Sequence, residues 1–184
     1  GTRQITQIDY VTMAQQGNAV DFGDQSGVLE GGGTCASSTR GVLAGGGNIQ
    51  RMDYVTIMTT GDTKDFGDLS ATVTSGTGLS NSTRGVFKLG FQSGFTNALE
   101  YITIATLGNS TDFGDALNVN SSLAMGASPT RGIIAGGASP SSPYPRVNVI
   151  QKIEILTTGN AIDFGDLNFA SSHPAGLTNG HGGL

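Results

Sequence analysis

The chain has 184 residues, of which 30 are glycine, none is tryptophan and only 12% are charged. The net charge is −5 and the nine Lys and Arg residues are scattered singly, so no basic stripe could neutralise a run of phosphates, and we expect no nucleic-acid partner. A single cysteine, Cys35, excludes an intrachain disulfide and a thiolate metal cage. No apolar run approaches the roughly 20 residues of a membrane helix, so we expect no membrane insertion. This composition favours an all-β fold of short strands.

The tetrapeptide Asp-Phe-Gly-Asp occurs four times, and its successive copies begin 44, 47 and 51 residues apart. The copies occupy residues 21–24, 65–68, 112–115 and 163–166. A period of this length is typical of a propeller or a solenoid. We therefore treat residues 1–184 as one domain of four repeats. The repeats cover approximately residues 1–42, 43–86, 87–133 and 134–184.

Each repeat predicts four short strands in a fixed order. A strand of small residues comes first, for example around residues 28–31, and a strand that follows Arg-Gly and ends in Gly-Gly comes second. The third strand, such as 52–57, alternates apolar and polar residues around a Tyr, and the fourth carries the tetrapeptide. The pair Gly61-Asp62 between the last two strands predicts a two-residue type II′ hairpin, because Gly supplies the positive φ of that turn. Equivalent pairs stand at 17–18, 108–109 and 159–160.

Two sets of repeated residues are expected to hold neighbouring sheets together. The large aromatic residue of each tetrapeptide should fill the space between adjacent sheets. These residues are Phe22, Phe66, Phe113 and Phe164. The second Asp of a tetrapeptide should accept hydrogen bonds from turn amides or from the guanidinium of the Arg residues that begin the Gly-Gly strands. These residues are Arg40, Arg84 and Arg131.

The two ends of the chain fit together in the numbering of the repeat. Residues 179–184 occupy the slots of residues 37–42, and Gly1 corresponds to Gly45, so only the two slots of residues 43 and 44 lie between the end of the chain and its beginning. We predict that the C-terminal strand completes the N-terminal blade and closes a β-propeller of four four-stranded blades, which removes exposed sheet edges. The alternative is an excerpt of a larger kelch-like propeller.

A strand that follows Arg-Gly and ends in Gly-Gly, then a Tyr strand, a tight turn and an aromatic strand resemble the kelch repeat, with Phe where kelch blades usually have Trp. The segments 101–106, 108–109 and 112–115, together with Ser38-Thr39-Arg40-Gly41, are also similar to kelch-like repeats in uncharacterised virion or tail-fibre proteins of marine and cyanobacterial phages. The resemblance covers nearly the whole chain. It implies a β-propeller and an extracellular or virion location.

The length differences between repeats all fall in one loop, the one after the Gly-Gly strand. Insertions of this kind in repeat folds collect on one face, which is often the binding face. Aromatic, Arg and amide side chains in these loops suit recognition of a sugar or a protein surface. The candidate binding residues are Phe91, Gln92, Phe95, Tyr144, Arg146 and Asn148. The alternative is a linker loop packed on a neighbouring subunit.

Catalysis has little support in the sequence. The paired Asp residues could offer hard oxygen ligands, but they recur in every repeat, whereas a catalytic site needs one asymmetric constellation. The only imidazoles, His173 and His181, lack a Ser/His/Asp or metal-binding spacing. We therefore predict no catalytic residue, no metal site and no cofactor.

The expected function is that of a non-enzymatic binding or structural module in a phage virion appendage, recognising a glycan or protein of the host surface. One alternative is an architectural fibre or capsid-decoration subunit that assembles with other virion subunits or with copies of itself. Another is a secreted glycan-active enzyme, which would need an acidic pair outside the tetrapeptides on the variable face.

Overall fold

The computed structural model describes residues 6–90, 94, 96–140 and 143–177, and each regular element in this part of the chain is a β-strand. The strands form one two-stranded and three four-stranded antiparallel sheets. The all-β prediction is confirmed, and the described residues include no helix that could span a membrane.

The strands follow in chain order within each sheet. The two-stranded sheet contains β1 (Gln7–Tyr10) and β2 (Val20–Asp24). The next sheet contains β3 (Gly33–Ala36), β4 (Arg40–Gly46), β5 (Ile49–Thr56) and β6 (Lys64–Val73). The third contains β7 (Thr77–Ser80), β8 (Arg84–Lys88), β9 (Ala98–Thr103) and β10 (Thr111–Asp115). The last contains β11 (Ala124–Ala127), β12 (Arg131–Ala135), β13 (Val147–Glu154) and β14 (Ile162–Ser171).

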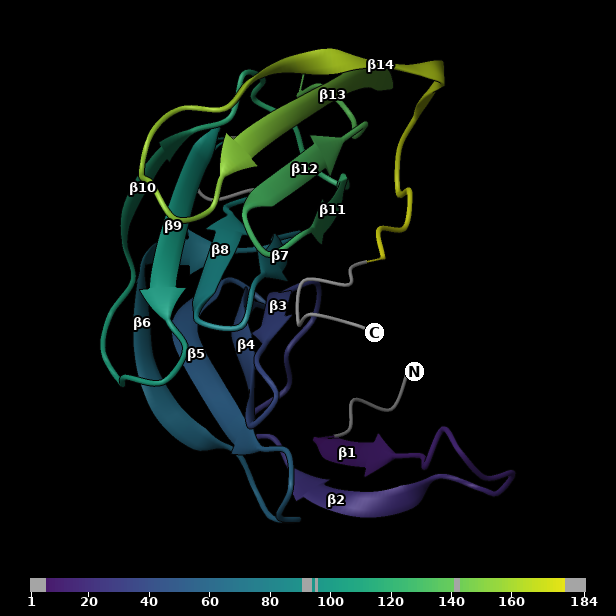
Figure 1. Cartoon of the computed structure of the whole chain (residues 1–184), viewed down its shortest axis with the longest axis vertical. Coiled ribbons are helices and arrows are strands. Elements are labelled where there is room, and N and C mark those ends of the chain that lie inside the picture. Colours follow the sequence, from purple (N-terminus) through teal and green to yellow (C-terminus); the bar gives the residue numbers. More distant parts are fainter. Residues whose placement is uncertain (1–5, 91–93, 95, 141–142, 178–184) are drawn as a thin grey trace.

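The four sheets follow one another around an arc, as Figure 1 shows. Strands β3, β7 and β11 lie side by side on the inner side of this arc, and the tetrapeptide strands lie on its outer side. Each four-stranded sheet therefore contains the predicted succession of a small-residue strand, a Gly-Gly strand, an alternating strand and a tetrapeptide strand. The first small-residue strand, β3, begins at Gly33, later than the segment 28–31 from which the sequence predicts it.

Small residues allow the inner strands to approach one another closely. A Cβ atom added at Gly78 of β7 would lie 2.5 Å from the carbonyl oxygen of Thr34 in β3. A Cβ atom at Gly126 of β11 would lie 2.8 Å from the carbonyl oxygen of Leu177 in the C-terminal segment. Both distances are shorter than a methyl group tolerates, so glycine is required where backbone packs on backbone.

Apolar side chains between consecutive sheets form two cores. One lies between the β3–β6 and β7–β10 sheets and includes Phe66, and the other lies between the β7–β10 and β11–β14 sheets and includes Phe113. Each of these rings is 2% exposed and meets a Tyr of the adjacent strand edge to face. Phe22 is half-buried against Tyr10.

The tetrapeptide forms a β-bulge in every sheet. In the third sheet, for example, Asp112 pairs with Glu100 and Gly114 with Leu99, so the register shifts at the intervening Phe. The Gly has a positive φ in each copy, between 134° and 146°, which a residue with a Cβ atom rarely adopts. The bulge turns backbone polar groups away from the sheet and towards the next one.

The Gly-Asn and Gly-Asp pairs do not form the predicted two-residue hairpins. The connection from β5 to β6 covers residues 57–63, and its tight turn is closed by Thr59 N–H donating to the Thr56 carbonyl at 3.0 Å. Gly61 N–H instead donates to the carbonyl of Phe22 in the preceding sheet at 2.6 Å, and the Asp62 carboxylate accepts from Asp24 N–H at 2.9 Å. The hairpin prediction was wrong because local sequence does not reveal that these donors and acceptors have partners in another sheet.

We call this set of contacts, between a Gly-Asn or Gly-Asp segment and the tetrapeptide of the preceding sheet, a junction. It recurs between each pair of consecutive sheets. Gly108 N–H donates to the Phe66 carbonyl at 2.8 Å, and Gly159 N–H donates to the Phe113 carbonyl at 2.7 Å. A junction thus fastens the outer edges of two sheets with backbone hydrogen bonds.

The sheets formed by the described residues do not close into a ring. Among the described residues, the sheet of β1 and β2 contains no strand from the C-terminal part of the chain. The predicted closure falls on residues 1–5 and 178–184, which lie outside the described residues.

Candidate functional site

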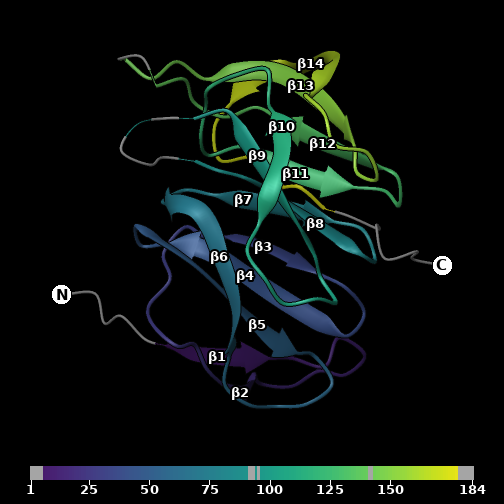
Figure 2. The same ribbon diagram turned by 90° about the vertical axis from the view of Figure 1, so that its left-hand side faces the viewer.

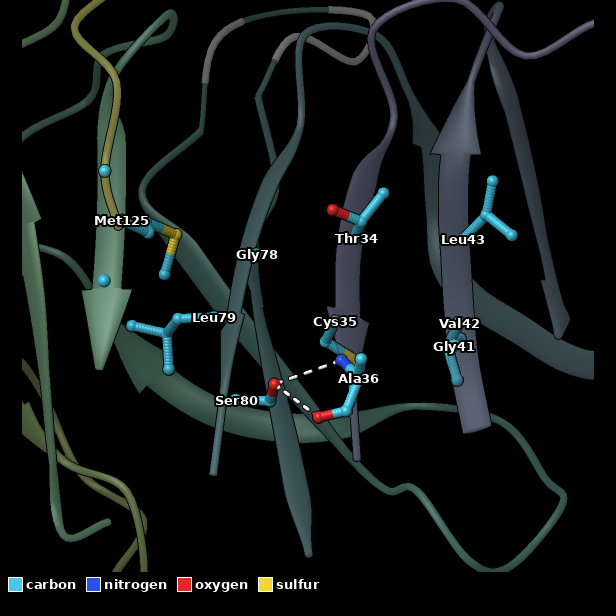
Figure 3. A pocket seen from close by; sticks show the side chains of 12 residues that line it. Thr34, Cys35, Ala36, Gly41, Val42, Leu43, Gly78, Leu79, Ser80 and Met125 are labelled. Atoms are coloured by element: carbon cyan, nitrogen blue, oxygen red, sulfur yellow. Dashed lines mark hydrogen bonds between the residues drawn. The ribbon is translucent and has the colours of Figure 1, made fainter. Parts of the chain in front are cut away.

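The inner strands line an open cavity of about 430 Å³, shown in Figure 3. Its walls come from β3, β4, β7 and β11, with Gly176 of the C-terminal segment. Ser80 connects the two central strands, because its hydroxyl donates to the Ala36 carbonyl at 2.8 Å and accepts from Ala36 N–H at 3.1 Å. Thr34 and Ser80 provide the side-chain oxygens of this cavity.

The remaining lining of this cavity is small or apolar. Cys35 lies in it, but burial raises the pKa of its thiol to about 12, so the thiol stays protonated at neutral pH and is a poor nucleophile. The cavity therefore offers shape and van der Waals contact, with little acid–base chemistry. It suits an apolar side chain better than it suits a reacting substrate.

A second region lies at the bases of the two long connections, β8–β9 and β12–β13, and centres on Lys88. This residue is 1% exposed, and its ammonium donates to three backbone carbonyls, those of Leu89, Thr96 and Asn120, at 2.9, 2.6 and 3.1 Å. Burial lowers the pKa of Lys88 from 10.5 to about 8. At neutral pH the buried ammonium thus holds the β8–β9 connection in place.

Asn120 joins the bases of both long connections. Its carbonyl accepts from Lys88, and its side-chain amide donates to the Gly136 carbonyl, at the end of β12, at 2.8 Å. Ser121 exchanges two backbone hydrogen bonds with Ala138, at 3.1 and 2.9 Å. The β10–β11 connection therefore supports the two variable loops together, and both loops leave the sheets on the same side, at the left of Figure 2.

The described part of the β12–β13 loop presents three of the predicted binding residues. Tyr144 is 59% exposed and has a positive φ of 60°, and Arg146 and Asn148 are exposed. Ala138 pairs with Arg146 across the loop, and Ser139 N–H donates to the Pro145 carbonyl at 2.9 Å. The loop is thus a short hairpin that extends the sheet and carries these side chains.

Three further predicted binding residues lie outside the described residues. They are Phe91, Gln92 and Phe95 in the β8–β9 connection.

The predicted Arg links between sheets exist in two repeats, with a different acceptor from the predicted carboxylate. The Arg40 guanidinium lies over the Tyr54 ring at 4.4 Å and donates to the Ile104 carbonyl of the next sheet at 2.7 Å. Arg84 does the same with Tyr101, at 4.3 Å, and with the Ile155 carbonyl, at 2.8 Å. The guanidinium donates to a backbone carbonyl at the end of a strand, and not to the predicted carboxylate, because the sheet fixes the position of that carbonyl.

Arg131 and Phe164 in the last sheet differ from their equivalents. Arg131 pairs with Glu154 of its own sheet at 3.3 Å, with both side chains more than half exposed. Phe164 is 56% exposed, whereas Phe66 and Phe113 are buried.

The sequence analysis missed a set of buried polar side chains directly before the Tyr slot. Asp53 accepts from the Arg51 guanidinium at 3.1 Å and from the Ser26 hydroxyl of the preceding sheet. Glu100 accepts from the Ser70 hydroxyl and from Ser70 N–H in the same way. Gln151 occupies the corresponding place in the last sheet. The sequence does mark these residues, because a polar residue stands twelve positions before the start of each tetrapeptide.

No family model matches the chain, and no curated protein is significantly similar to it.

Proposed function

We propose that the chain is a non-enzymatic β-propeller module, in which the four-stranded sheets are blades and the variable loops recognise a glycan or protein of a host-cell surface. The observation that carries this proposal is the common support of the two long loops. Lys88, Asn120 and Gly136 hold their bases against the same connection. A rigid base of this kind presents exposed loop side chains without a large ordering cost on binding.

The loop chemistry suits a polar, ring-bearing ligand. Tyr144 offers an aromatic face, on which a sugar ring can stack, and Arg146 and Asn148 offer hydrogen-bond donors beside it. The resemblance to kelch-like repeats of marine and cyanobacterial phage virion proteins is what favours a tail-fibre or other virion component, with an extracellular location. An architectural fibre subunit is the second candidate, and it is favoured by the outer face of the last sheet, where Phe164 is 56% exposed and no described residue covers it.

Binding to immobilised glycans and to whole bacterial cells tests this function. We expect the chain to bind a host surface, and the double substitution Tyr144→Ala and Arg146→Ala to abolish binding without changing the melting temperature. Leu107→Ala is the matched control, because Leu107 is 53% exposed in a β9–β10 connection at the other end of the sheets. The proposal would be contradicted if the chain bound no host surface, or if Leu107→Ala lost as much binding as the double variant.

A further inference from the structure

The two ends of the arc carry the two unpaired halves of a junction. At one end, a Cβ atom added at Gly165 of the last tetrapeptide would have no atom of the described residues within 4 Å, whereas a Cβ atom at Gly23, Gly67 or Gly114 would lie 2.4–2.6 Å from a glycine carbonyl of the next sheet. At the other end stand Gly17 and Asn18, the equivalents of the donors and acceptors in the three junctions. Each half has the residue types that complete the other.

The outer face of the last sheet is apolar and uncovered by described residues. Phe164 and Ile162 are 56% and 54% exposed. A hollow of about 460 Å³ on this face is lined by Ile133, Phe164 and Leu177, with Arg131 beside them. In the second and third sheets the equivalents of Phe164, Phe66 and Phe113, are buried by a neighbouring sheet and are each 2% exposed.

The opposite face of the β1–β2 sheet is the counterpart of that neighbour. Val11 and Met13 are 59% and 98% exposed, whereas Ile102 and Ile104, in the same slots of the third sheet, are 3% and 1% exposed. The Met13 carbonyl occupies the slot of the Ile104 carbonyl, which accepts from Arg40. It therefore matches Arg131, whose guanidinium has no such acceptor from a following sheet among residues 6–90, 94, 96–140 and 143–177.

The C-terminal segment lies where the inner strand of a further sheet would stand, and β1 and β2 could supply the outer strands of such a sheet. Residues 175–177 stand at the same distance from their tetrapeptide as β3, β7 and β11 do, and the segment packs on β11 so closely that a Cβ atom at Gly176 would lie 2.2 Å from the Met125 carbonyl. The strands β1 and β2 of the same chain lie at the other end of the arc (Figure 1). A second copy can present its β1–β2 sheet there without any change in the arc of the first copy.

We propose that copies of this chain associate head to tail, with the β1–β2 sheet of one copy covering the last sheet of another through a fourth junction. Gly17 and Ala19 N–H of one copy donate to the Phe164 and Asp166 carbonyls of the other, and the Arg131 guanidinium donates to the Met13 carbonyl. Such a heterologous contact forms a ring where its rotation closes and a filament where it does not. The inference rests on the junctions and not on the ligand of the loops, so loss of glycan binding leaves it intact.

Sedimentation equilibrium over a range of concentrations is the first test. We expect species whose masses are multiples of 18.7 kDa. Phe164→Ser should raise the dissociation constant by about ten-fold or more, because it removes an aromatic side chain from a buried contact. Met58→Ser is the matched control, since Met58 is 82% exposed and belongs to neither terminal face, and it should leave the constant unchanged. A monomer at every concentration would overturn the proposal.

Directed cross-linking is the second test. Asn18→Cys and Asp166→Cys chains, mixed under mild oxidation, should give a covalent heterodimer, and neither variant alone should cross-link. The buried Cys35 thiol, whose pKa is raised to about 12, stays unreactive. Cross-linking of Asn18→Cys to itself, or a double variant that forms only an intrachain disulfide in a monomer, would refute head-to-tail association.

Discussion

Single arginine residues each connect three elements of the fold. The Arg84 guanidinium stacks on Tyr101 of its own sheet and donates to the Ile155 carbonyl of the next one. A planar guanidinium can stack on a ring and donate in its plane at the same time, whereas the ammonium of a lysine cannot. Arg131 makes neither contact and pairs with Glu154 on the surface.

Arg84→Lys should therefore destabilise the protein, and Arg131→Lys should not. We expect Arg84→Lys to lower the free energy of unfolding by about 1–2 kcal/mol and the melting temperature by roughly 2–8 °C. Thermal denaturation followed by circular dichroism of dilute samples measures both variants. Equal melting curves for wild type and Arg84→Lys would show that the stacked geometry contributes nothing.

Lys88 gives stability a specific dependence on pH. Its pKa is about 8 in the folded chain and near 10.5 when solvated, so between these values the unfolded chain binds more protons than the folded one. Charging the buried amine thus costs free energy below pH 8 relative to a solvated lysine, and stability rises by about 3 kcal/mol in total as this cost disappears between pH 8 and 10.5.

Urea unfolding from pH 7 to 10.5 should show this gain, and Lys88→Met should lack it. Comparing wild type with Lys88→Met at each pH removes the contributions of other titrating groups. A difference between the two proteins that does not change with pH would mean that Lys88 keeps its ordinary pKa in the folded state.

At the scale of the element, the tetrapeptide strand serves two sheets. Its bulge places Phe in the core and directs backbone groups of the second Asp to the next sheet, where Thr63, Ser110 and Ala161 N–H donate to the three corresponding carbonyls at 2.9, 2.9 and 2.7 Å. The first Asp of the first copy also stabilises the bulge, since its carboxylate accepts from Gly23 N–H at 3.1 Å. One strand motif thus explains both the internal shape of a sheet and its attachment to a neighbour.

Gly114→Ala and Gly165→Ala separate these two roles. Both positions have a positive φ, of 134° and 141°, so each substitution adds backbone strain of about 1–3 kcal/mol. Only the Cβ atom at position 114 would meet a neighbouring sheet, at 2.6 Å from the Gly159 carbonyl. We expect Gly114→Ala to be clearly the more destabilising in denaturant unfolding at low protein concentration; equal losses would argue against the junction.

At the scale of the whole molecule, the sheets form a row in which each contacts mainly its neighbours. Stability in such an array is a sum of sheet and interface contributions, so the sheet with the fewest neighbours is the weakest. The β7–β10 sheet has a core on both faces, whereas the β1–β2 sheet has only two strands and contributes no residue to either core. A two-stranded sheet by itself is marginally stable in water.

Amide hydrogen exchange should reveal this gradient. In dilute protein, we expect the amides of β1 and β2 to exchange first and those of β8 and β9 last. At concentrations that favour head-to-tail association, protection of β1 and β2 should increase while that of β8 changes little. Uniform exchange across the four sheets would indicate a single cooperative unit instead of a row of sheets.

Much of this architecture could be predicted from the repeat alone. The fixed spacing of the tetrapeptide, the Gly-Gly endings and the alternation around the Tyr slot indicate the all-β class and the order of four strands per sheet, because these are local consequences of backbone and side-chain periodicity. The central rings Phe66 and Phe113 follow from the same reasoning. The positions of the variable loops also follow, because insertions stand out against a constant repeat.

Only the tertiary structure decided which hydrogen-bond partners the polar groups have. The Gly-Asp pair at 61–62 has the sequence of a hairpin turn, yet it bonds another sheet, and Arg84 prefers a carbonyl to the predicted carboxylate. Lys88 is one basic residue among nine in the sequence, and the carbonyls that its buried ammonium meets belong to two connections, β8–β9 and β10–β11. A repeat determines what each sheet contains, whereas contacts between sheets depend on the distances that packing creates.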